Sequence, residues 1–345
     1  MKAVVLHKNG DLGRLKIEDV PEPKPQKNEV VVRLHSAALN HLDIWVRKGL
    51  RSQKLTAPHI LGSDGAGVIV EKGADTHGVN IGDAVIINPG LSCGCCEYCR
   101  QGEQSECLSF GIIGMSRPGT YAEKIAVPFE NVWPKPSHLD FQEAAALPLA
   151  HQTAWRMLMT RAGLKAGETV LIHGIGGGVA LACLQFAKLA GAIVLVTSSS
   201  DKKIEKAGKL GASYGINYRT AGSVSKTVME LTGGRGVDVI ADTVGAATLP
   251  VNIEVIRKGG RIVLCGVTSG PTCQTNLQSI YWNQLTILGS TMGSNEDFRQ
   301  MLMAVTAAKL KPVIDSVEPL ENIKAAADKM EQGEQFGKIV LSIYR

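Results

Sequence analysis

Strand-like and helix-like runs alternate through the middle of the chain, and this alternation constrains the fold more than any other feature. The run ETVLIHG, which begins at Glu168, is followed by the helical run VALACLQFAKLAG, and the alternation continues to GGRIVLCG, which ends at Gly266. Repeated strand–helix–strand units produce a parallel sheet with right-handed crossovers. We therefore expect an α/β domain with a doubly wound parallel sheet over residues 151–290.

The first third of the chain has a different pattern. Its short runs are rich in β-branched residues and are bounded by Gly, Pro, Asn and Asp, which predicts antiparallel strands. A helical stretch starts at Phe141, and Pro148 is expected to break it. Because 345 residues exceed the length at which a single core stops growing, we expect two domains.

A glycine-rich turn lies between the first strand of the alternation and its helix. Glycines at this point let the backbone approach a pyrophosphate, whose charge is stabilised at the helix N-terminus. Gly174, Gly177 and Ala180 fit the spacing G-x-x-G-x-x-A, whereas G-x-G-x-x-G would place Val179 at its third glycine. The turn predicts a dinucleotide site with contacts at Gly174, Gly177, Gly178 and Val179.

The end of the second strand bears on the choice of cofactor. An acidic residue there would hold the ribose 2′-OH of NAD, whereas cationic or small polar residues suit the 2′-phosphate of NADP. In VLVTSSSDKK, Ser198 stands at that position and Lys203 follows it, while Asp201 is expected to cap the next helix. The pattern favours NADP(H), with NAD(H) as the alternative.

Four cysteines are gathered in one short stretch, with gaps of two, two and seven residues: Cys93, Cys96, Cys99 and Cys107. Four thiolates at this spacing can enclose a tetrahedral Zn²⁺ completely, which makes the metal structural. A disulfide pair would need an oxidising compartment. A ferredoxin-type cluster closes after three residues and is followed by Pro, whereas Leu108 follows here. We predict one structural Zn²⁺ per chain, without Cys95.

Composition excludes several other classes of protein. The chain is 44% hydrophobic and 20% charged, as in ordinary globular proteins, and its net charge of +5 comes from scattered Lys and Arg rather than a basic run. It contains no apolar run of 18 residues. The apolar stretch at its N-terminus is only a few residues long, so we do not expect a signal peptide. We expect a cytoplasmic protein that acts on a small molecule and binds neither nucleic acid nor membrane.

Taken together, the motifs resemble those of the medium-chain dehydrogenase/reductases. The resemblance is carried by AALNHLDIWVRKG, LGSDGAGVIVEKG, the cysteine loop, GTYAEKIAVP, the glycine turn, GGRIVLCG and FGKIVL. It implies a GroES-like antiparallel β catalytic domain over residues 1–150 and 291–345, with the zinc loop at 93–107. It also implies an inserted Rossmann domain over residues 151–290, with the active site in the cleft between the domains.

The chain departs from the zinc alcohol dehydrogenases of that family at the second, catalytic zinc. The family holds this metal with a Cys, a His-Glu pair and a later Cys. Asn40, Ser63 with Asp64, and Leu149 stand at those positions here, and Leu42 replaces the hydroxyl of the proton relay. None of the soft ligands that hold Zn²⁺ well remains.

Asn40, Asp43 and the aromatic Trp45 instead resemble the quinone oxidoreductase branch, although that branch usually has Tyr where Trp45 stands. The resemblance implies hydride transfer from NADPH to an electron-poor alkene or quinone without a catalytic metal. Asn40 and Ser63 would then stabilise the developing oxyanion, His41 would return a proton, and Trp45 would wall the pocket.

The sequence also allows other hypotheses for the active site and the activity. A substitute metal site could form from three histidines and an acid, namely His35, His59, His151 and Asp64. The chain could also be an alcohol dehydrogenase or carbonyl reductase with a non-standard site, or an NAD(P)-binding relative without turnover.

The resemblance adds cofactor contacts outside the glycine turn. It places Thr153 beside the nicotinamide, Tyr218 by the 2′-phosphate and Lys338 near the pyrophosphate, with further contacts at Gly266 and Val267.

Two apolar strands, GGRIVLCGVTSG and LTILGSTMG, come last in the parallel sheet. An apolar edge strand that stays open is an aggregation hazard, and pairing with a twofold mate removes it. We therefore predict a homodimer, or a dimer of dimers.

Overall fold

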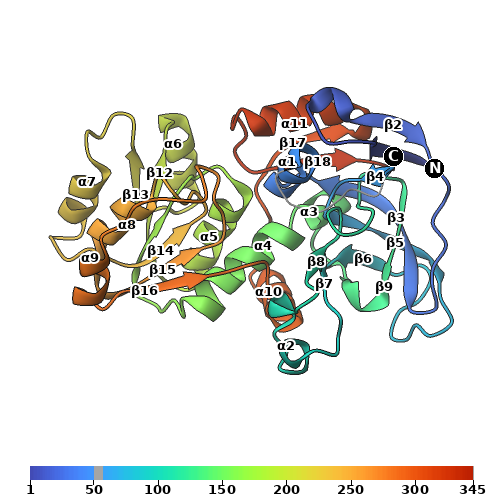
Figure 1. The fold of residues 1–345 in the computed structure, drawn as a ribbon, viewed down its shortest axis with the longest axis horizontal. Helices are drawn as coiled ribbons and strands as arrows, with labels where there is room; N and C mark the ends of the chain where they lie inside the picture. Colours follow the sequence, from blue (N-terminus) through green and yellow to red (C-terminus); the bar gives the residue numbers. More distant parts are fainter. Residues whose placement is uncertain (50–56, 345) are drawn as a thin grey trace. The chain divides into compact units, whose positions relative to one another are not determined.

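A computed structural model describes residues 1–49 and 57–344 (Figure 1). The chain forms two compact units, Met1–Ala150 together with the chain from Ser294 onward, and His151–Gly293. We expected the return to the first unit at residue 291. In the structure the second unit ends at Gly293. Met292 is buried in it, and its sulfur accepts a long 3.9 Å hydrogen bond from Thr153 Oγ1 of the same unit.

A seven-stranded sheet forms the centre of the first unit. Its order is β10-β6-β5-β3-β18-β17, and β9 also pairs with β3. All its pairings are antiparallel except β17 with β18. Its strands are β3 (Glu29–Ala38), β5 (Asp64–Lys72), β6 (Ala84–Ile87), β9 (Lys124–Pro128), β10 (Val132–Pro134), β17 (Ile314–Pro319) and β18 (Lys338–Ser342). The final strand of the chain therefore lies beside the long N-terminal strand β3.

Smaller elements surround this sheet. Three short strands form a second sheet, β1 (Lys2–Leu6), β2 (Lys16–Asp19) and β4 (His59–Ile60), and β7 (Gly90–Leu91) pairs with β8 (Gly111–Ile112). The helices are α1 (His41–Lys48), α2 (Glu97–Arg100), α3 (Phe141–Ala145), α10 (Asn295–Ala307) and α11 (Ile323–Glu331), with short 3₁₀ turns at Leu12–Arg14, Gln104–Glu106, Phe129–Asn131 and Leu320–Asn322.

The second unit contains the predicted parallel sheet. Its order is β13-β12-β11-β14-β15-β16, and every pairing is parallel. The strands are β11 (Thr169–Ile172), β12 (Ile193–Ser198), β13 (Tyr214–Asn217), β14 (Val237–Asp242), β15 (Ile256–Leu264) and β16 (Thr286–Gly289). The chain winds outward from β11 to β13 and then crosses over to β14. This reversal is the topological switch point at which doubly wound sheets bind ligands.

Helices pack against this sheet: α5 (Gly178–Leu189) on β11 and β12, α6 (Asp201–Lys209) on β12 and β13, and α8 (Leu249–Val255) on β14 and β15 (Figure 1). The remaining helices are α7 (Val224–Leu231) and α9 (Leu277–Trp282). Strand β14 is buried at all six residues, as expected for a central strand of a parallel sheet that is covered on both faces, and two of these residues are Asp238 and Asp242. The predicted α/β class with a doubly wound parallel sheet is confirmed.

The helical stretch near Phe141 is interrupted as predicted, because α3 ends at Ala145 and Pro148 begins α4 (Pro148–Trp155). Proline lacks an N–H and suits the first turn of a helix, where that donor has no partner. The stretch Arg156–Arg161 continues α4 as a π-helix. Among the described residues, none of the helices combines the length and apolar character needed to cross a bilayer.

One cap differs from our expectation. Ser200, and not Asp201, caps α6, because its hydroxyl accepts a hydrogen bond from Lys203 N. The Asp201 carboxylate instead accepts one from Asn217 Nδ2 at 2.8 Å.

Candidate functional site

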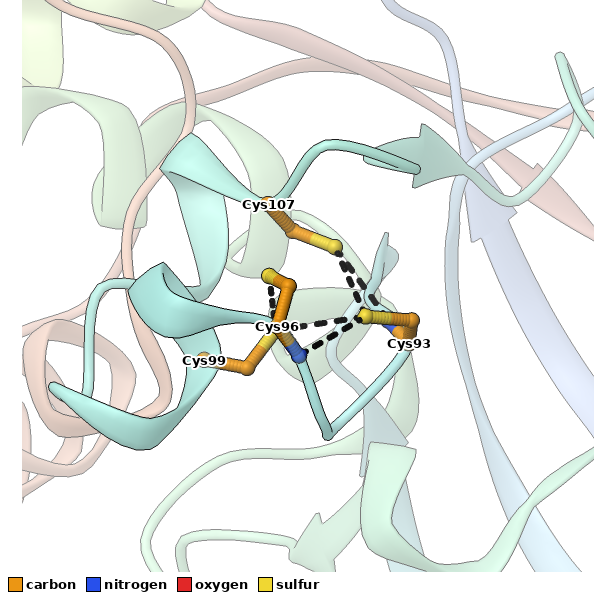
Figure 2. Close-up of side chains that lie close together, drawn as sticks. All are labelled: Cys93, Cys96, Cys99 and Cys107. Atoms are coloured by element: carbon orange, nitrogen blue, oxygen red, sulfur yellow. Dashed lines mark hydrogen bonds between the residues drawn. The ribbon is translucent and has the colours of Figure 1, made fainter.

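The four predicted metal ligands converge in the loop between β7 and β8. Cys96 is the N-cap of α2 and Cys99 is its third residue, and Cys93 and Cys107 come from the loop on either side (Figure 2). Their sulfur atoms all lie within 4.8 Å of one another. Individual Sγ–Sγ distances are 3.5 Å for Cys96–Cys99 and Cys93–Cys107 and 4.0 Å for Cys93–Cys99. A tetrahedral zinc site with Zn–S bonds of about 2.3 Å requires roughly 3.8 Å between sulfurs, so the loop fits the metal.

Backbone N–H groups favour the thiolate form of two of these cysteines, which is the form that binds a cation. Hydrogen bonds from the backbone of Cys95 and Cys96 lower the pKa of Cys93 to about 6, and the backbone of Cys99 and Leu108 lowers the pKa of Cys96. Burial raises the pKa of Cys99 to about 11. A bound cation would have to displace that proton, because only the thiolate is a strong ligand.

A buried cluster of polar side chains lies where β3, β5 and β18 meet. Ala38 at the end of β3 pairs with Asp64 of β5 on one side and with Val340 of β18 on the other. This register brings Asn40, Asp64 and Lys338 together, and each is less than a tenth exposed.

Lys338 is the centre of this cluster. Its Nζ donates to Asn40 Oδ1 at 2.6 Å, to Leu39 O at 2.7 Å and to Asp64 Oδ2 at 2.9 Å. Three acceptors use all three hydrogens of the ammonium. The resemblance had implied that Lys338 lies near the cofactor pyrophosphate, whereas in the structure its charge is directed at Asp64.

The other polar atoms of Asn40 and Asp64 are also engaged. Asn40 Nδ2 donates to Asp64 Oδ2 at 2.9 Å, and its second contact, with Ala38 O, is long at 3.5 Å. Asp64 Oδ1 accepts a hydrogen bond from Leu149 N at 2.8 Å. The amide of Asn40 therefore retains one weakly bound hydrogen.

A second carboxylate supports the start of α1. Asp43 Oδ2 accepts from Asn40 N at 2.8 Å and from Tyr121 OH at 2.6 Å, and Oδ1 accepts from Gly62 N at 3.3 Å. Burial raises the pKa of Asp43 to about 6, although the hydrogen bond from Tyr121 acts in the opposite direction.

The other predicted catalytic residues have different environments. Ser63 is fully buried, and its hydroxyl donates to Ile113 O at 2.8 Å. His41 is exposed at the first turn of α1, and the ring of half-buried Trp45 meets it edge-on at 6.0 Å. Desolvation by neighbouring atoms and the charge of Lys48 lower the pKa of His41, even though the side chain reaches the surface.

The structure does not assemble the substitute metal site. His59 Nε2 pairs with Gly114 O at 2.9 Å, His35 stacks on Phe141, and His151 Nε2 pairs with Gln185. Within residues 1–49 and 57–344, the four-cysteine cluster is the only group of three or more His, Cys, Asp and Glu side chains close enough to hold an ion.

The glycine turn in the second unit follows β11 directly. Gly174 and Gly176 have φ of 68° and 119°, conformations that favour glycine, and Gly177 is the N-cap of α5. Gly178 and Val179 form the first turn of the helix and are half-buried.

The remaining cofactor candidates of this unit lie mostly at the carboxyl ends of its strands. Ser198 ends β12 and is buried, and its carbonyl accepts from Tyr218 N at 3.0 Å, which places the two residues side by side. Lys203 lies in the first turn of α6. Gly266 and half-exposed Val267 follow β15. Thr153 lies in α4 and is buried.

Sequence reasoning missed the partners of these residues. Nothing in the sequence linked Lys338 to Asp64 or Tyr121 to Asp43, because the partners are 274 and 78 residues apart. It also passed over His173, although this histidine directly precedes the glycine turn.

Comparison with known proteins agrees with both units. A family described as alcohol dehydrogenase GroES-like domain matches residues 26–137, and one described as zinc-binding dehydrogenase matches residues 178–307. A zinc-type alcohol dehydrogenase-like protein of Schizosaccharomyces pombe is 35% identical over 350 residues, covering 99% of each chain. The quinone oxidoreductase of Homo sapiens is 30% identical over 349 residues, covering 99% of this chain and 97% of its own. The crystal structure of an NAD-dependent alcohol dehydrogenase superposes with a TM-score of 0.95 at 44% identity, with complete coverage of both chains.

We predict that Tyr121→Phe moves the titration of Asp43 to higher pH, because it removes the hydrogen bond that lowers this pKa. The pKa of about 6 lies above the ordinary value of 3.8, so the folded protein holds the proton more tightly than the unfolded chain. The contribution of this group to stability is therefore complete below pH 3.8 and is lost as pH rises through about 6.

The carboxyl ¹³C chemical shift of Asp43, assigned with Asp43→Asn, measures this midpoint. The exposed Tyr344→Phe serves as the control and should leave the midpoint in place. A midpoint that stays the same or falls in Tyr121→Phe would contradict the prediction.

Proposed function

The chain belongs to the medium-chain dehydrogenase/reductases, the NAD(P)-dependent oxidoreductases of the zinc-binding dehydrogenase family, and we propose that it transfers hydride from NADPH to an electron-poor alkene or quinone without a catalytic metal. The observation that carries the proposal is the ammonium of Lys338, held between Asn40 and Asp64.

Lys338 supports a metal-free site for an electrostatic reason. Asp64 is the one carboxylate among the residues that stand at the family's catalytic-zinc positions, and the lysine already neutralises it. A divalent cation at this point would meet a fixed positive charge, an amide and a hydroxyl that donates to Ile113 O. Such a donor set is poor for Zn²⁺, which prefers thiolate, imidazole and free carboxylate.

NADPH, when bound, supplies the hydride that adds to the β-carbon of an enone or to a quinone. The weakly bound amide hydrogen of Asn40 is the proposed donor to the oxygen on which negative charge develops. The nearby ammonium of Lys338 polarises this amide, because it binds Asn40 Oδ1. We had expected Ser63 to share this role. It is not part of the proposed mechanism, because its hydroxyl hydrogen is already donated to Ile113 O.

His41 is the proposed proton donor, and Trp45 beside it would favour flat, apolar substrates. Since desolvation lowers the pKa of His41, the ring holds a proton less readily than a free imidazole. Turnover that depends on this proton should therefore rise as pH falls toward the pKa.

The end of β12 supports NADP(H) over NAD(H). Ser198 carries no charge that would repel a 2′-phosphate, Tyr218 lies next to it, and Lys203 is close along the chain. The nearest acid, Asp201, uses its carboxylate to accept a hydrogen bond from Asn217. The second candidate activity, alcohol oxidation with NAD, is favoured by the similarity to the NAD-dependent alcohol dehydrogenase structure.

We predict that the purified protein oxidises NADPH with enones or quinones, and that Asn40→Ala lowers kcat by about 10²-fold with little change in cofactor affinity. Asn131→Ala is the matched control, because Asn131 is another buried asparagine of the same unit that donates only to backbone carbonyls. Steady-state rates across a substrate panel, with NADPH and NADH, measure both effects. One outcome would refute the mechanism. In it, added Zn²⁺ switches on alcohol oxidation, and a chelator abolishes this activity while the four-cysteine site stays filled.

The four-cysteine loop is proposed to hold one structural zinc per chain. A reducing compartment such as the cytoplasm, which we propose as the location, keeps the thiolates available to the metal. Metal analysis should find about one equivalent of zinc, because four thiolates make one closed site. Cys96→Ser should lose the metal, whereas Cys95→Ser should keep it. Iron in the purified protein, or zinc retained by Cys96→Ser, would be incompatible with this site.

A homodimer through the β16 edge is proposed from the apolar surface at that end of the sheet. Leu277, Tyr281 and Trp282 of α9 are 65–71% exposed, and Ile287 of the edge strand β16 is 38% exposed. Only three residues separate α9 from β16, so the apolar helix and the open strand edge are neighbours along the chain. A second copy of the chain could cover both.

We predict that Ile287→Lys halves the mass measured by light scattering at micromolar concentration, because a charge on the edge strand opposes strand pairing. Leu189→Lys places the same charge on another exposed apolar site, on α5, and should leave the mass of the dimer unchanged. A monomeric mass for the unmodified protein would disprove the interface.

A further inference from the structure

A buried chain of polar side chains connects the carboxyl ends of the central strands in the second unit. His173 follows β11, and its Nδ1 pairs with Thr197 Oγ1 of β12 at 3.0 Å. Its Nε2 pairs with Asn252 Oδ1 of α8 at 2.7 Å, and Asn252 Nδ2 donates to Asp242 Oδ2 of β14 at 2.6 Å. All four residues are at most 3% exposed.

The donors and acceptors of this network follow from the carboxylate of Asp242 at one end. Asp242 as a carboxylate only accepts, so the amide nitrogen of Asn252 faces it and the amide oxygen faces His173. His173 therefore carries its hydrogen on Nε2, and Nδ1 accepts from the hydroxyl of Thr197. Burial lowers the pKa of His173, which keeps the ring in this neutral form. Every hydrogen-bonding atom of the imidazole is satisfied.

The histidine end of the network adjoins two loops of the predicted cofactor site, those that follow β11 and β12. His173 is the residue before Gly174, so its ring fixes the backbone from which the glycine turn starts. Thr197 holds the same turn from the other side, because its carbonyl accepts from Ile175 N at 2.9 Å. Thr197 also directly precedes Ser198, the residue expected near the adenosine ribose.

The aspartate end binds the loop after β14, which in turn packs on the loop after β15. Asp242 Oδ1 accepts from Val244 N at 2.7 Å and from Gly245 N at 3.0 Å. A Cβ added to Gly245 would lie 3.2 Å from Gly266 O, so the loop after β14 packs closely on the loop that carries Gly266 and Val267.

We propose that the His173–Asn252–Asp242 network with Thr197 is the positioning element of the dinucleotide site, which fixes all four strand-end loops in one geometry before the cofactor binds. The inference rests on the dinucleotide site proposed above. Preorganised loops bind more tightly because little ordering remains to be done on binding. The network residues touch one another and the loop backbone, so they act through the loops.

A second cluster provides a matched control at the opposite end of the same strands. Asp238 of β14 is also buried, and it accepts from Thr169 N of β11 at 2.9 Å and from the guanidinium groups of Arg235 and Arg257. It ties together the amino ends of the strands. A change there should affect stability and leave the carboxyl-end loops in place.

The test measures dissociation constants of NADPH and NADH by fluorescence titration, together with the melting temperature, for the full-length protein. His173→Phe removes both polar contacts, whereas His173→Gln keeps a donor near the position of Nε2. We expect His173→Phe to weaken cofactor binding by about tenfold or more and His173→Gln to recover most of it. Asp238→Asn should lower the melting temperature and leave the dissociation constant within about twofold.

Thr197→Val, which removes a single hydrogen bond, gives the same test if His173→Phe does not fold. The proposal is overturned if the His173 and Thr197 variants bind the cofactor like the unmodified protein. It is also overturned if affinity falls equally in Asp238→Asn, because the effect would then follow stability alone. An unmodified protein that binds neither nucleotide would overturn the dinucleotide site itself, whereas binding without turnover would leave this inference intact and refute only the proposed reaction.

Discussion

The buried ion pair between Lys338 and Asp64 is the interaction on which the first unit depends. Removing two charges from water costs several kcal/mol per ion, and this cost is offset only when every remaining polar atom finds a partner. Here the ammonium has three acceptors, and the carboxylate also accepts from Asn40 and Leu149. These bonds can form only when the last strand, β18, lies beside β3. The pair therefore couples the last strand of the chain to Asn40, before α1, and to the start of β5.

The second unit satisfies its buried carboxylate by a different means. Asp242 has no cation among the partners described above and accepts from Asn252 Nδ2, Thr248 Oγ1 and two backbone N–H groups. Neutral donors of this kind fix a loop without adding a charge near the cofactor phosphates. A cationic partner appears instead at Asp238, at the amino end of the same strand, where the arginines are partly exposed. The two ends of β14 thus hold their carboxylates with different kinds of partner, neutral donors at Asp242 and arginines at Asp238.

The sequence predicted the fold in outline because the fold depends on local patterns. The period of the apolar residues indicated strands and helices, and the glycines at 174 and 176 marked the turn that needs positive φ. The cysteine spacing alone predicted the four-cysteine cluster that the structure assembles, since all four residues lie within one stretch of 15 residues and no distant segment is needed. The resemblance then predicted that Asn40 and Ser63 would lie at the catalytic centre.

What the sequence could not determine is which polar atoms pair across the fold. The predictions of the cysteine loop, of the succession of strands and helices and of the family depended only on motifs whose residues are close together in the sequence. The hydrogen-bond partners of Lys338, Ser63 and His173 were decided by how distant segments pack, which brings residues tens to hundreds of positions apart within 3 Å. A buried donor must find an acceptor in whatever surroundings the packed sheet provides, and only the tertiary structure specifies those surroundings.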